Sequence, residues 1–432
     1  MAGFLRVLGF AQPPGAHAAH ALAGGGVSGV RQEGGNVTAV QLASECAQQF
    51  AKRAEAYDRD AAFPSEDIDD LRDAGLLGLL VPERLGGMGA GFETYTDVAT
   101  TLAHGSGASA LVFNMHAAVT GALATIPDDL ARQLGVPEAF FADRDRLLAD
   151  AAAGALYGVA ITEREAGGRL SAMRTTFAPE GDGYRLRGHK SVCTGAGHLD
   201  GYLVAARAAD GTDEAPRVSY FLVAASDGLT VEPSWDPLGM RATASNGFRL
   251  DIHVPAAALI GRLEGLAVLL AYAMPQWLVA SYASVYMGVA EAILAEALAY
   301  IGARAVAGQS AGLARVGFVR ARLGRAEAQV AAARLVLREA GRSVDARPVD
   351  PETVRWVYRA KLLAGDAATE VATSCTEACG LGVLRRGAVM ERLFRDARSG
   401  AVMPPSSDVC ADVLGTAALG LDPVTGSDVR PW

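Results

Sequence analysis

The sequence contains few side chains with the type and spacing that chemistry needs. Its five cysteines are scattered, except that Cys375 and Cys379 are four residues apart. This spacing would place two thiols on one face of a helix, where they could bind a metal ion. No second Cys or His pair lies nearby to complete a tetrahedral zinc site, so we expect no metal. Few, scattered cysteines also suit a reducing compartment, and we expect a cytoplasmic protein.

Two other side chains could take part in proton transfer or nucleophilic attack. His116, in Phe113 to His116, lies in a predicted apolar helix, where it could face a ligand pocket and transfer a proton. The alternative is a core histidine with a backbone partner. Cys193 has no basic motif beside it to lower the pKa of its thiol, so packing is favoured over a nucleophilic role.

Composition and charge exclude some classes of partner. Half of the 432 residues are hydrophobic and the net charge is −9, with no basic run that would bind nucleic acid. The stretch Gly265 to Ala290 is uncharged and long enough to cross a membrane. It contains Pro275 and Gln276 and continues an Ala-rich helical pattern, which favours a helix buried among other helices.

Hydrophobic periodicity divides the chain into regions that must position any site. Spacings of three and four residues predict helices, and short alternating runs such as Tyr184 to Gly188 predict strands. We therefore expect a mainly α protein with a central β domain. The predicted regions are a flexible extension (1–36), a helical domain (37–154), a β domain (155–262), a helical bundle (263–420) and a tail (421–432).

Five segments, in this order, are similar to the acyl-CoA dehydrogenase superfamily. They are Val81 to Gly89, Ala160 to Glu163, Gly239 to Asn246 with the following Val254-Pro255, Arg304 four residues before Gly308, and Glu391 to Ala397. Each is weak alone, but five in the right order are strong. The resemblance implies an N-terminal helical domain, a small β-barrel or sandwich, a C-terminal four-helix bundle, and a homo-oligomer, either tetramer or dimer.

The resemblance also implies FAD, with FMN as the alternative, between the β domain and the C-terminal helices. The residues that it implies for cofactor binding are Ile161, Thr162, Cys193, Thr194, Arg304, Gly380, Gly382 and Ser406. Hydroxyls near the ring would tune the flavin, and a cation would bind the pyrophosphate of a cofactor held mainly by a neighbouring subunit. The alternatives are a turn hydroxyl for Thr194 and a solvated helix face for Arg304.

The proton-abstracting carboxylate of a dehydrogenase is missing from both of the family's usual positions. One position falls at Pro404 and the other in Gln276 to Ala280, which contains no Asp or Glu. Asp408 lies four residues beyond Pro404 and could substitute for the base. The alternative is a solvated or helix-capping aspartate.

Other departures point to a different branch of the superfamily. Gly167 to Arg169 lacks the family's serine beside pantetheine, and Val192 replaces the tryptophan that often covers the flavin. Cys193 to Ala196 resembles the flavin-dependent monooxygenases of this fold, such as dibenzothiophene monooxygenase and the nitrososynthases. Those enzymes add oxygen to reduced flavin and transfer one atom from a flavin hydroperoxide, which needs no α-proton base.

The leading hypothesis is a monooxygenase that oxygenates nitrogen or carbon of a biosynthetic intermediate. The substrate would be an amino sugar or a carrier-bound acyl group, and a separate reductase would supply reduced flavin. The second hypothesis is an acyl-CoA or acyl-carrier-protein dehydrogenase whose base has moved to Asp408. The third is a non-catalytic scaffold that keeps the fold.

Overall fold

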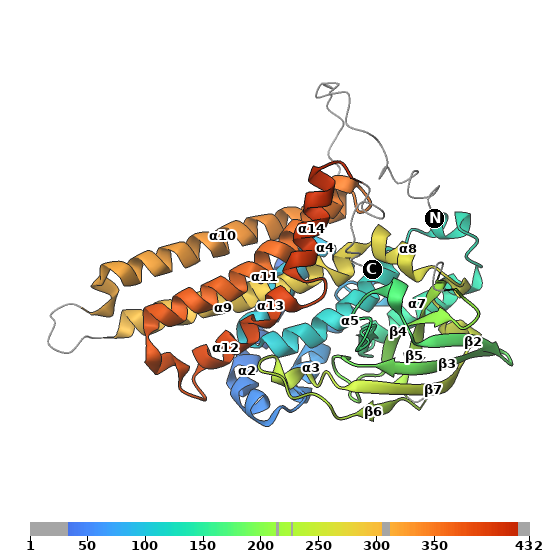
Figure 1. The fold of residues 1–432 in the computed structure, drawn as a ribbon, viewed down its shortest axis with the longest axis horizontal. Helices are drawn as coiled ribbons and strands as arrows, with labels where there is room; N and C mark the ends of the chain where they lie inside the picture. The colour runs from blue at the N-terminus through green and yellow to red at the C-terminus, as the bar shows by residue number, and fades with distance from the viewer. Residues whose placement is uncertain (1–32, 213–215, 226–227, 305–311, 422–432) are drawn as a thin grey trace, which may run out of the picture.

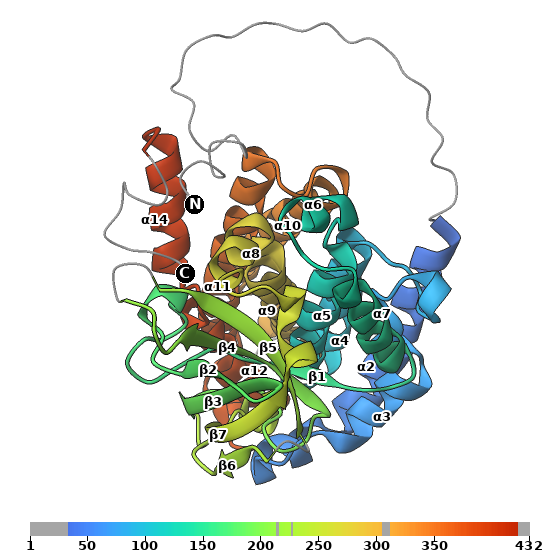
Figure 2. The ribbon, with the colours of Figure 1, turned by 90° about the vertical axis from the view of Figure 1, so that its right-hand side faces the viewer.

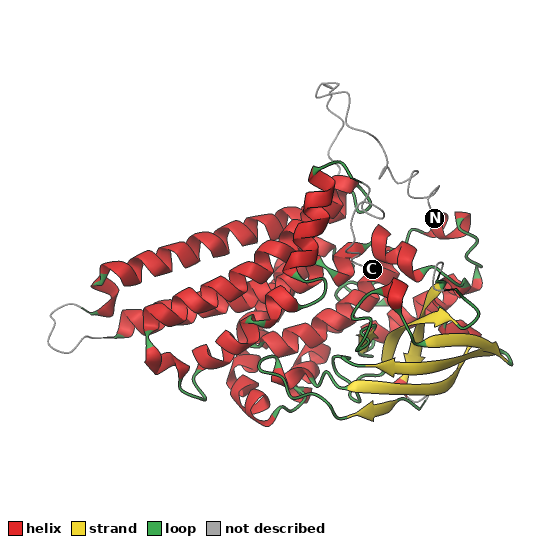
Figure 3. Ribbon diagram, in the orientation of Figure 1, coloured by secondary structure: helices red, strands yellow, loops and turns green. Residues whose placement is uncertain are grey.

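The computed structural model describes residues 33–212, 216–225, 228–304 and 312–421, with side chains from Ala39 onward. The β-sheet lies at one end of the molecule and helices make up the rest, as Figure 3 shows by colour. The predicted class, mainly α with a central β domain, is confirmed. Most of the predicted extension and of the predicted tail lies outside the described residues.

The N-terminal helices are α2 (Glu33–Asp60), α3 (Ser65–Asp73), α4 (Phe92–Gly105), α5 (Gly107–Thr125), α6 (Asp128–Gln133) and α7 (Ala139–Ala152). Ser106 begins α5, because its side chain accepts a hydrogen bond from the Ser109 amide. Gly75 follows α3 in the left-handed conformation, with φ +70°. At the other end of α3, Pro64 occupies the N-cap position, and no side chain caps the helix.

The β domain is one curled seven-stranded sheet. Its strands are β1 (Tyr157–Ala160), β2 (Thr176–Glu180), β3 (Gly183–Lys190), β4 (Gly201–Ala208), β5 (Val218–Ala224), β6 (Thr230–Glu232) and β7 (Gly247–Pro255). The order is β1-β4-β2-β3-β7-β6, with β5 on the other edge of β4. β1 and β2 run parallel to β4, and the other pairs are antiparallel.

The C-terminal helices are α8 (Ala267–Ala273), α9 (Ala280–Ala303), α10 (Gly317–Ala346), α11 (Pro351–Cys379), α12 (Val389–Ala397), α13 (Ser399–Val402) and α14 (Ser407–Ala418). The long helices α9, α10 and α11 run side by side away from the sheet (Figure 1). Asp350 begins α11 by accepting hydrogen bonds from the amides of Glu352 and Thr353.

The uncharged stretch 265–290 is not the single helix that its pattern predicts. Residues Pro275–Leu278 form a short 3-10 helix, η8, between α8 and α9. Pro275 has no amide hydrogen and disfavours helical geometry at the residue before it, where Met274 has φ −131° and ψ 55°. Val279 is also non-helical, with φ −130° and ψ −75°. The chain therefore changes direction in the middle of the core.

Two helices, α5 and α9, are long and apolar enough to cross a membrane by length and composition. The most apolar part of α5 is 89% buried inside the protein, and that of α9 is 56% buried. α5 contacts β1 on one side and α9 on the other, so it joins the sheet to the bundle (Figure 2). Both helices therefore pack as core elements. The sequence analysis considered only the stretch 265–290 as a possible membrane span and did not identify α5.

Candidate active site

A cavity of about 730 Å³ lies where the sheet, α5, α9 and the segment after α12 meet. Its lining is Leu111, Met115, Val159, Ile161, Thr162, Gly168, Val192, Thr194, Trp235, Met240, Thr243, Ser245, Leu278, Tyr282, Ser399, Met403 and Pro404. We call this space the central cavity.

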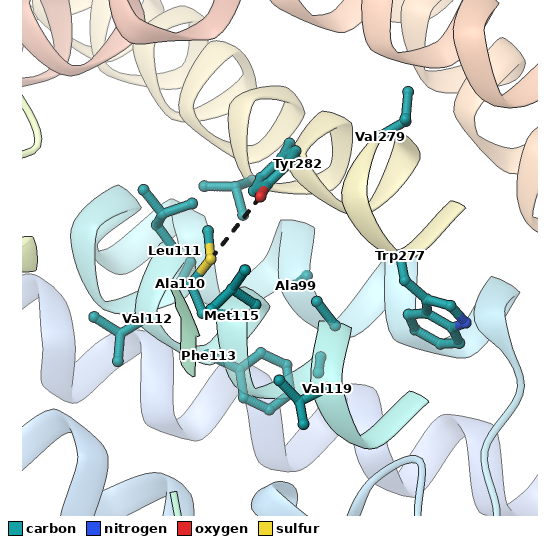
Figure 4. Packing of buried hydrophobic residues seen from close by; sticks show 14 of the residues in the cluster. Ala99, Ala110, Leu111, Val112, Phe113, Met115, Val119, Trp277, Val279 and Tyr282 are labelled. Atoms are coloured by element: carbon teal, nitrogen blue, oxygen red, sulfur yellow. Dashed lines mark hydrogen bonds between the residues drawn. The ribbon is translucent and has the colours of Figure 1, made fainter. Parts of the chain in front are cut away.

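Apolar side chains of α5 and one tyrosine of α9 form one wall of the central cavity. Figure 4 shows Tyr282 and Met115 pointing toward one another across the gap between these helices, and the Tyr282 hydroxyl lies 4.0 Å from the Met115 sulfur. Burial raises the pKa of the Tyr282 phenol well above its ordinary value, so it stays protonated. Among the lining side chains described, Tyr282 carries the one ionisable group.

Three hydroxyls form another part of the lining. Thr194 Oγ1 lies 3.1 Å from Ser245 Oγ, which lies 2.7 Å from Thr243 Oγ1. Thr243 Oγ1 also donates to the Met240 carbonyl at 2.9 Å. Thr243 and Ser245 stand on a tight turn in which Met240 and Ala244 have positive φ, whereas Thr194 follows β3. The result is a short, connected row of hydroxyls at the edge of the sheet.

The turn that carries Thr243 and Ser245 packs closely against helix α12. Asp396 of α12 accepts a hydrogen bond from the Met240 amide at 2.5 Å. A Cβ atom at Gly239 would lie 2.2 Å from the Arg395 carbonyl oxygen, so only glycine fits there. The bundle therefore positions the hydroxyl wall directly.

A buried ion pair positions the strand ends that carry Thr162 and Thr194. Lys190 Nζ donates to Glu163 Oε1 at 2.7 Å and to the Ile161 carbonyl at 3.3 Å. Ser191 N donates to the Thr162 carbonyl at 2.9 Å. Burial opposes the Glu163 charge, but Lys190 and hydrogen bonds outweigh it and hold the Glu163 pKa below its usual range.

These walls fit a flat ligand with apolar faces and a polar edge, such as a flavin ring. Trp235 lines the cavity, and its indole Nε1 is a buried donor without a partner among the described residues. A buried donor without an acceptor costs free energy that a bound heteroatom would recover. With the three hydroxyls, it offers the kind of polar contacts that flavin heteroatoms need.

Comparison with protein families identifies the fold. The N-terminal, middle and C-terminal domain models of acyl-CoA dehydrogenase match residues 39–135, 158–252 and 280–402, in that order. The chain belongs to the acyl-CoA dehydrogenase superfamily. Superfamily members are flavin-dependent oxidoreductases.

Individual superfamily members with different reactions are similar to this chain. The putative acyl-CoA dehydrogenase YdbM of Bacillus subtilis is 27% identical over 377 residues, covering 86% of this chain and 94% of the relative. The FMN-bound structure of TdsC from Paenibacillus sp. A11-2, a dibenzothiophene monooxygenase, has a TM-score of 0.76 at 24% identity and covers 88% of this chain and 97% of TdsC. KijD3, in complex with FMN and dTDP-3-amino-2,3,6-trideoxy-4-keto-3-methyl-D-glucose, has a TM-score of 0.76 at 26% identity and covers 90% of this chain and 94% of KijD3.

Only some of the predicted cofactor-binding residues line the central cavity. Ile161, Thr162 and Thr194 line the central cavity. Cys193 is fully buried and does not line it, and burial raises the pKa of its thiol to about 12. Ser406 caps α14, where its hydroxyl accepts from the Val409 amide, and does not line the cavity either.

Arg304 and the two predicted glycines lie together at the end of the bundle that points away from the sheet (Figure 1). Arg304 follows α9 and stacks on the Tyr300 ring, with its guanidinium carbon 5.2 Å from the ring centroid. A Cβ atom at Gly382 would lie 2.9 Å from the Tyr300 hydroxyl and 3.4 Å from the Arg304 guanidinium. All three residues are exposed, so this chain's own central cavity does not include them.

The two predicted catalytic residues lie outside the central cavity. His116 is buried, with Nε2 2.7 Å from the Leu77 carbonyl and Nδ1 accepting from the Tyr157 amide at 3.1 Å. Burial lowers its pKa to about 4, so the ring is neutral and both nitrogens are used by the backbone. Asp408 is exposed in the first turn of α14 and does not line the cavity.

Sequence reasoning missed Tyr282, Trp235 and the hydroxyl pair Thr243 and Ser245. The pair stands inside the segment Gly239 to Asn246, which we used only for its resemblance to the family. Its alternating hydroxyls were a readable signal for a polar wall. Tyr282 lies on α9 and Leu278 at the end of η8, with the non-helical Val279 between them, so helical periodicity could not have placed both at one site.

Proposed function

We propose that this protein is a flavin-dependent monooxygenase. The observation that carries the proposal is Pro404, which stands in the wall of the central cavity where the family's usual base is expected. Among the described residues, the lining contains no Asp, Glu or His, so no side chain there can accept an α-proton. Oxygen transfer to a nucleophilic substrate needs no such base.

The reaction balances with two co-reactants, molecular oxygen and reduced flavin. Substrate, molecular oxygen and two-electron-reduced flavin give the oxygenated substrate, water and oxidised flavin. The flavin supplies the activation of oxygen, and a separate reductase supplies the reduced flavin. Leu111, Met115 and Val159 exclude water from the reacting atoms. The protonated Tyr282 hydroxyl would be available in the cavity as a hydrogen-bond donor to a reacting oxygen.

The proposed cofactor is FAD, with FMN as the alternative. Trp235 Nε1 and the hydroxyls of Thr162, Thr194 and Ser245 would contact it from the sheet side. In a homodimer or tetramer, the exposed Arg304 would bind the pyrophosphate of a partner's FAD, with Gly382 allowing close approach. An FAD-specific loss of affinity on Arg304→Ala, without a change in FMN affinity, would support this arrangement.

The test is a reductase-coupled oxygenation assay. Purified protein, free reductase, NAD(P)H, oxygen and candidate substrates of the amino-sugar and acyl-thioester classes should give products heavier by one oxygen atom, and ¹⁸O₂ should label them. The same protein with acyl-CoA and an artificial electron acceptor, but no reduced flavin, should form no enoyl product. Efficient enoyl formation would overturn the proposal.

The second candidate function is that of a dehydrogenase. It is suggested by the similar protein YdbM, which is named a putative acyl-CoA dehydrogenase. It requires a base that the central cavity does not provide among its described residues. Asp408 would have to move from its exposed position on α14. Loss of dehydrogenase turnover in Asp408→Asn, with flavin retained, would favour this candidate.

A further inference from the structure

The central cavity contains sulfur atoms that no step of the proposed reaction uses. Three of its lining residues are methionines, Met115, Met240 and Met403. Among the described residues the lining has no Cys, Lys or His, and the phenol of Tyr282 stays protonated. Its electron-rich groups are therefore the thioether sulfurs and the indole of Trp235. A thioether accepts an oxygen atom at a lone pair, whereas oxygenation of an indole carbon disrupts an aromatic ring. Sulfur is thus the favoured oxygen acceptor in these walls.

The three sulfur atoms lie in different surroundings. The Met115 sulfur is 4.0 Å from the Tyr282 hydroxyl, and the two side chains point toward one another (Figure 4). The Met240 sulfur lies at the start of α5, because a Cβ atom at Gly107 would be 3.6 Å from it. Met403 is partly exposed, so oxidants reach it from solvent. Met115 is 5% exposed, and it combines this burial with proximity to the hydroxyl donor of the cavity.

The Tyr282 hydroxyl favours oxygen transfer to the Met115 sulfur. An oxygen atom added to the sulfur on the side of the hydroxyl lies within hydrogen-bond distance of Tyr282 Oη. A donor at this place stabilises the negative charge that develops on a reacting oxygen. The same hydroxyl is available for transfer to a bound substrate. In an empty cavity the sulfur is the nucleophile beside this donor, and a bound substrate separates the sulfur from the reacting oxygen.

We infer that Met115 is an internal site of oxygen transfer, which is oxidised to methionine sulfoxide when no substrate occupies the central cavity. The inference rests on the proposed function, which supplies the co-reactants. The Met115 thioether, molecular oxygen and two-electron-reduced flavin give Met115 sulfoxide, water and oxidised flavin. An S–O bond forms and the O–O bond breaks, and sulfur and flavin each give two electrons. The second oxygen atom leaves as water with the two hydrogens of the reduced flavin.

Oxidation of Met115 changes the cavity wall. A sulfoxide is polar and chiral, whereas the thioether is apolar. Its oxygen accepts a hydrogen bond from the Tyr282 hydroxyl and occupies the donor that the substrate reaction needs. The modified protein therefore loses oxygenation activity, and a substrate that fills the cavity protects it. Turnover without substrate thus ends itself.

The first test locates the oxygen in wild-type protein by mass spectrometry. Full-length protein, flavin, a free reductase, NAD(P)H and ¹⁸O₂ are incubated without substrate, and catalase removes free hydrogen peroxide. Fragment ions of proteolytic peptides assign the added oxygen to individual methionines. Met115 should gain ¹⁸O about tenfold faster than Met173 and Met390, which are buried but do not line the cavity. Protein with oxidised flavin and no NAD(P)H should gain no label.

Other distributions of the label would overturn the inference. Label that disappears when catalase is added comes from free peroxide and not from transfer inside the cavity. Equal labelling of Met115 and Met390 means that the cavity directs no oxygen to Met115. Label at Trp235 in place of Met115 means that the indole is the acceptor.

A small free thioether tests competition for the same oxygen atom. Methyl phenyl sulfide has the reacting group of methionine and no charge, which suits a cavity without charged side chains in its described lining. It should become labelled sulfoxide and lower the labelling of Met115 as its concentration rises. If the probe is labelled but Met115 stays unlabelled even when the probe is left out, the inference is wrong and the proposed function stands. If neither is labelled and acyl-CoA gives enoyl product, the proposed function fails as well.

Variants test the loss of activity. Wild-type protein that is preincubated with reduced flavin and oxygen should lose oxygenation of methyl phenyl sulfide as Met115 becomes labelled. Met115→Leu removes the sulfur and keeps a similar volume, so it should retain a larger fraction of its own starting activity. The matched control is Met390→Leu on α12, which should lose activity as the wild type does. Equal losses in the two variants would overturn the inactivation by Met115. The labelling experiment needs only the wild type, so it decides the site of transfer even where a variant does not fold.

Discussion

Lys190 Nζ lies 2.7 Å from Glu163 Oε1 in the interior of the β domain, where the two side chains are 0% and 5% exposed. Glu163 also accepts hydrogen bonds from the amides of Arg174 and Thr175, at 2.7 and 3.0 Å. The pair thus joins the end of β1, the segment before β2 and the end of β3. It holds the two threonines that face the proposed flavin without touching the cavity itself.

Replacing one partner of this pair should be more damaging than replacing both. Lys190→Met leaves a buried carboxylate without its counter-charge, and the expected loss of unfolding free energy is about 3–5 kcal/mol. Glu163→Gln/Lys190→Met removes the charge and keeps an acceptor for the two amides, so it should lose less. Urea denaturation followed by circular dichroism measures both. If the single and double variants lose the same unfolding free energy, Lys190 does not stabilise the fold by balancing the negative charge of Glu163.

Tyr282→Phe should lower oxygenation turnover by about 100-fold, because it removes the protonated hydroxyl from the central cavity. Flavin affinity should stay the same, since the proposed flavin contacts come from the sheet side. Single-turnover measurement with reduced flavin separates the two effects.

Tyr286 provides the matched control on the same helix. Its hydroxyl is also buried, has no partner among the described residues and does not line the central cavity. Tyr286→Phe should therefore keep wild-type turnover. A similar loss in both variants would show that α9 tolerates neither change and that the Tyr282 hydroxyl has no special role.

Asp408→Asn should leave oxygenation turnover at the wild-type level. The side chain is exposed on α14 and lies outside the central cavity, so the change removes a solvated charge near the start of a helix. The only expected cost is a fraction of a kcal/mol, about 0.3–1, from the lost interaction with the helix dipole. The measurement is oxygenation turnover with saturating reduced flavin. A large loss of turnover would support a role for Asp408 as a catalytic base.

The order of elements could be predicted because it depends on local periodicity. The strand predicted over Tyr184 to Gly188 is present as the central part of β3. The break at Met274–Val279 was missed because the pattern on both sides of Pro275 is equally apolar. Proline can bend a buried helix or end it, and only packing decides.

The candidate site was predictable only where family motifs mark it. Thr162 and Thr194 stand in such motifs and line the central cavity. Tyr282 and Trp235 come from segments whose facing depends on how α9 and the loop before β7 pack, which a single sequence does not fix. For His116, too, the sequence alone could not decide between two roles. Its apolar surroundings fitted both a proton donor and a core residue, and the partners that distinguish these roles, Leu77 and Tyr157, are 39 and 41 residues away.

His116 should make stability depend on pH in acid. Its folded pKa is about 4, below the ordinary value of 6.5, because burial disfavours the charged ring. The unfolded chain therefore binds more protons between these two values, and stability falls as the pH falls through this window and is complete above it. From about pH 7 to about pH 5, the expected loss of unfolding free energy from this group alone is about 2 kcal/mol.

The measurement compares wild type with His116→Gln by urea denaturation at both pH values. The variant should be less stable near neutral pH, because glutamine does not reproduce the bonds to the Leu77 carbonyl and the Tyr157 amide. It should also lose about 2 kcal/mol less on acidification, because no imidazole is left to charge. Buried carboxylates with raised pKa values, such as Asp67 and Asp396, change stability in the opposite sense but equally in both proteins. Parallel pH profiles would show that His116 titrates alike in the folded and unfolded chains, and that its ring is not held neutral by burial.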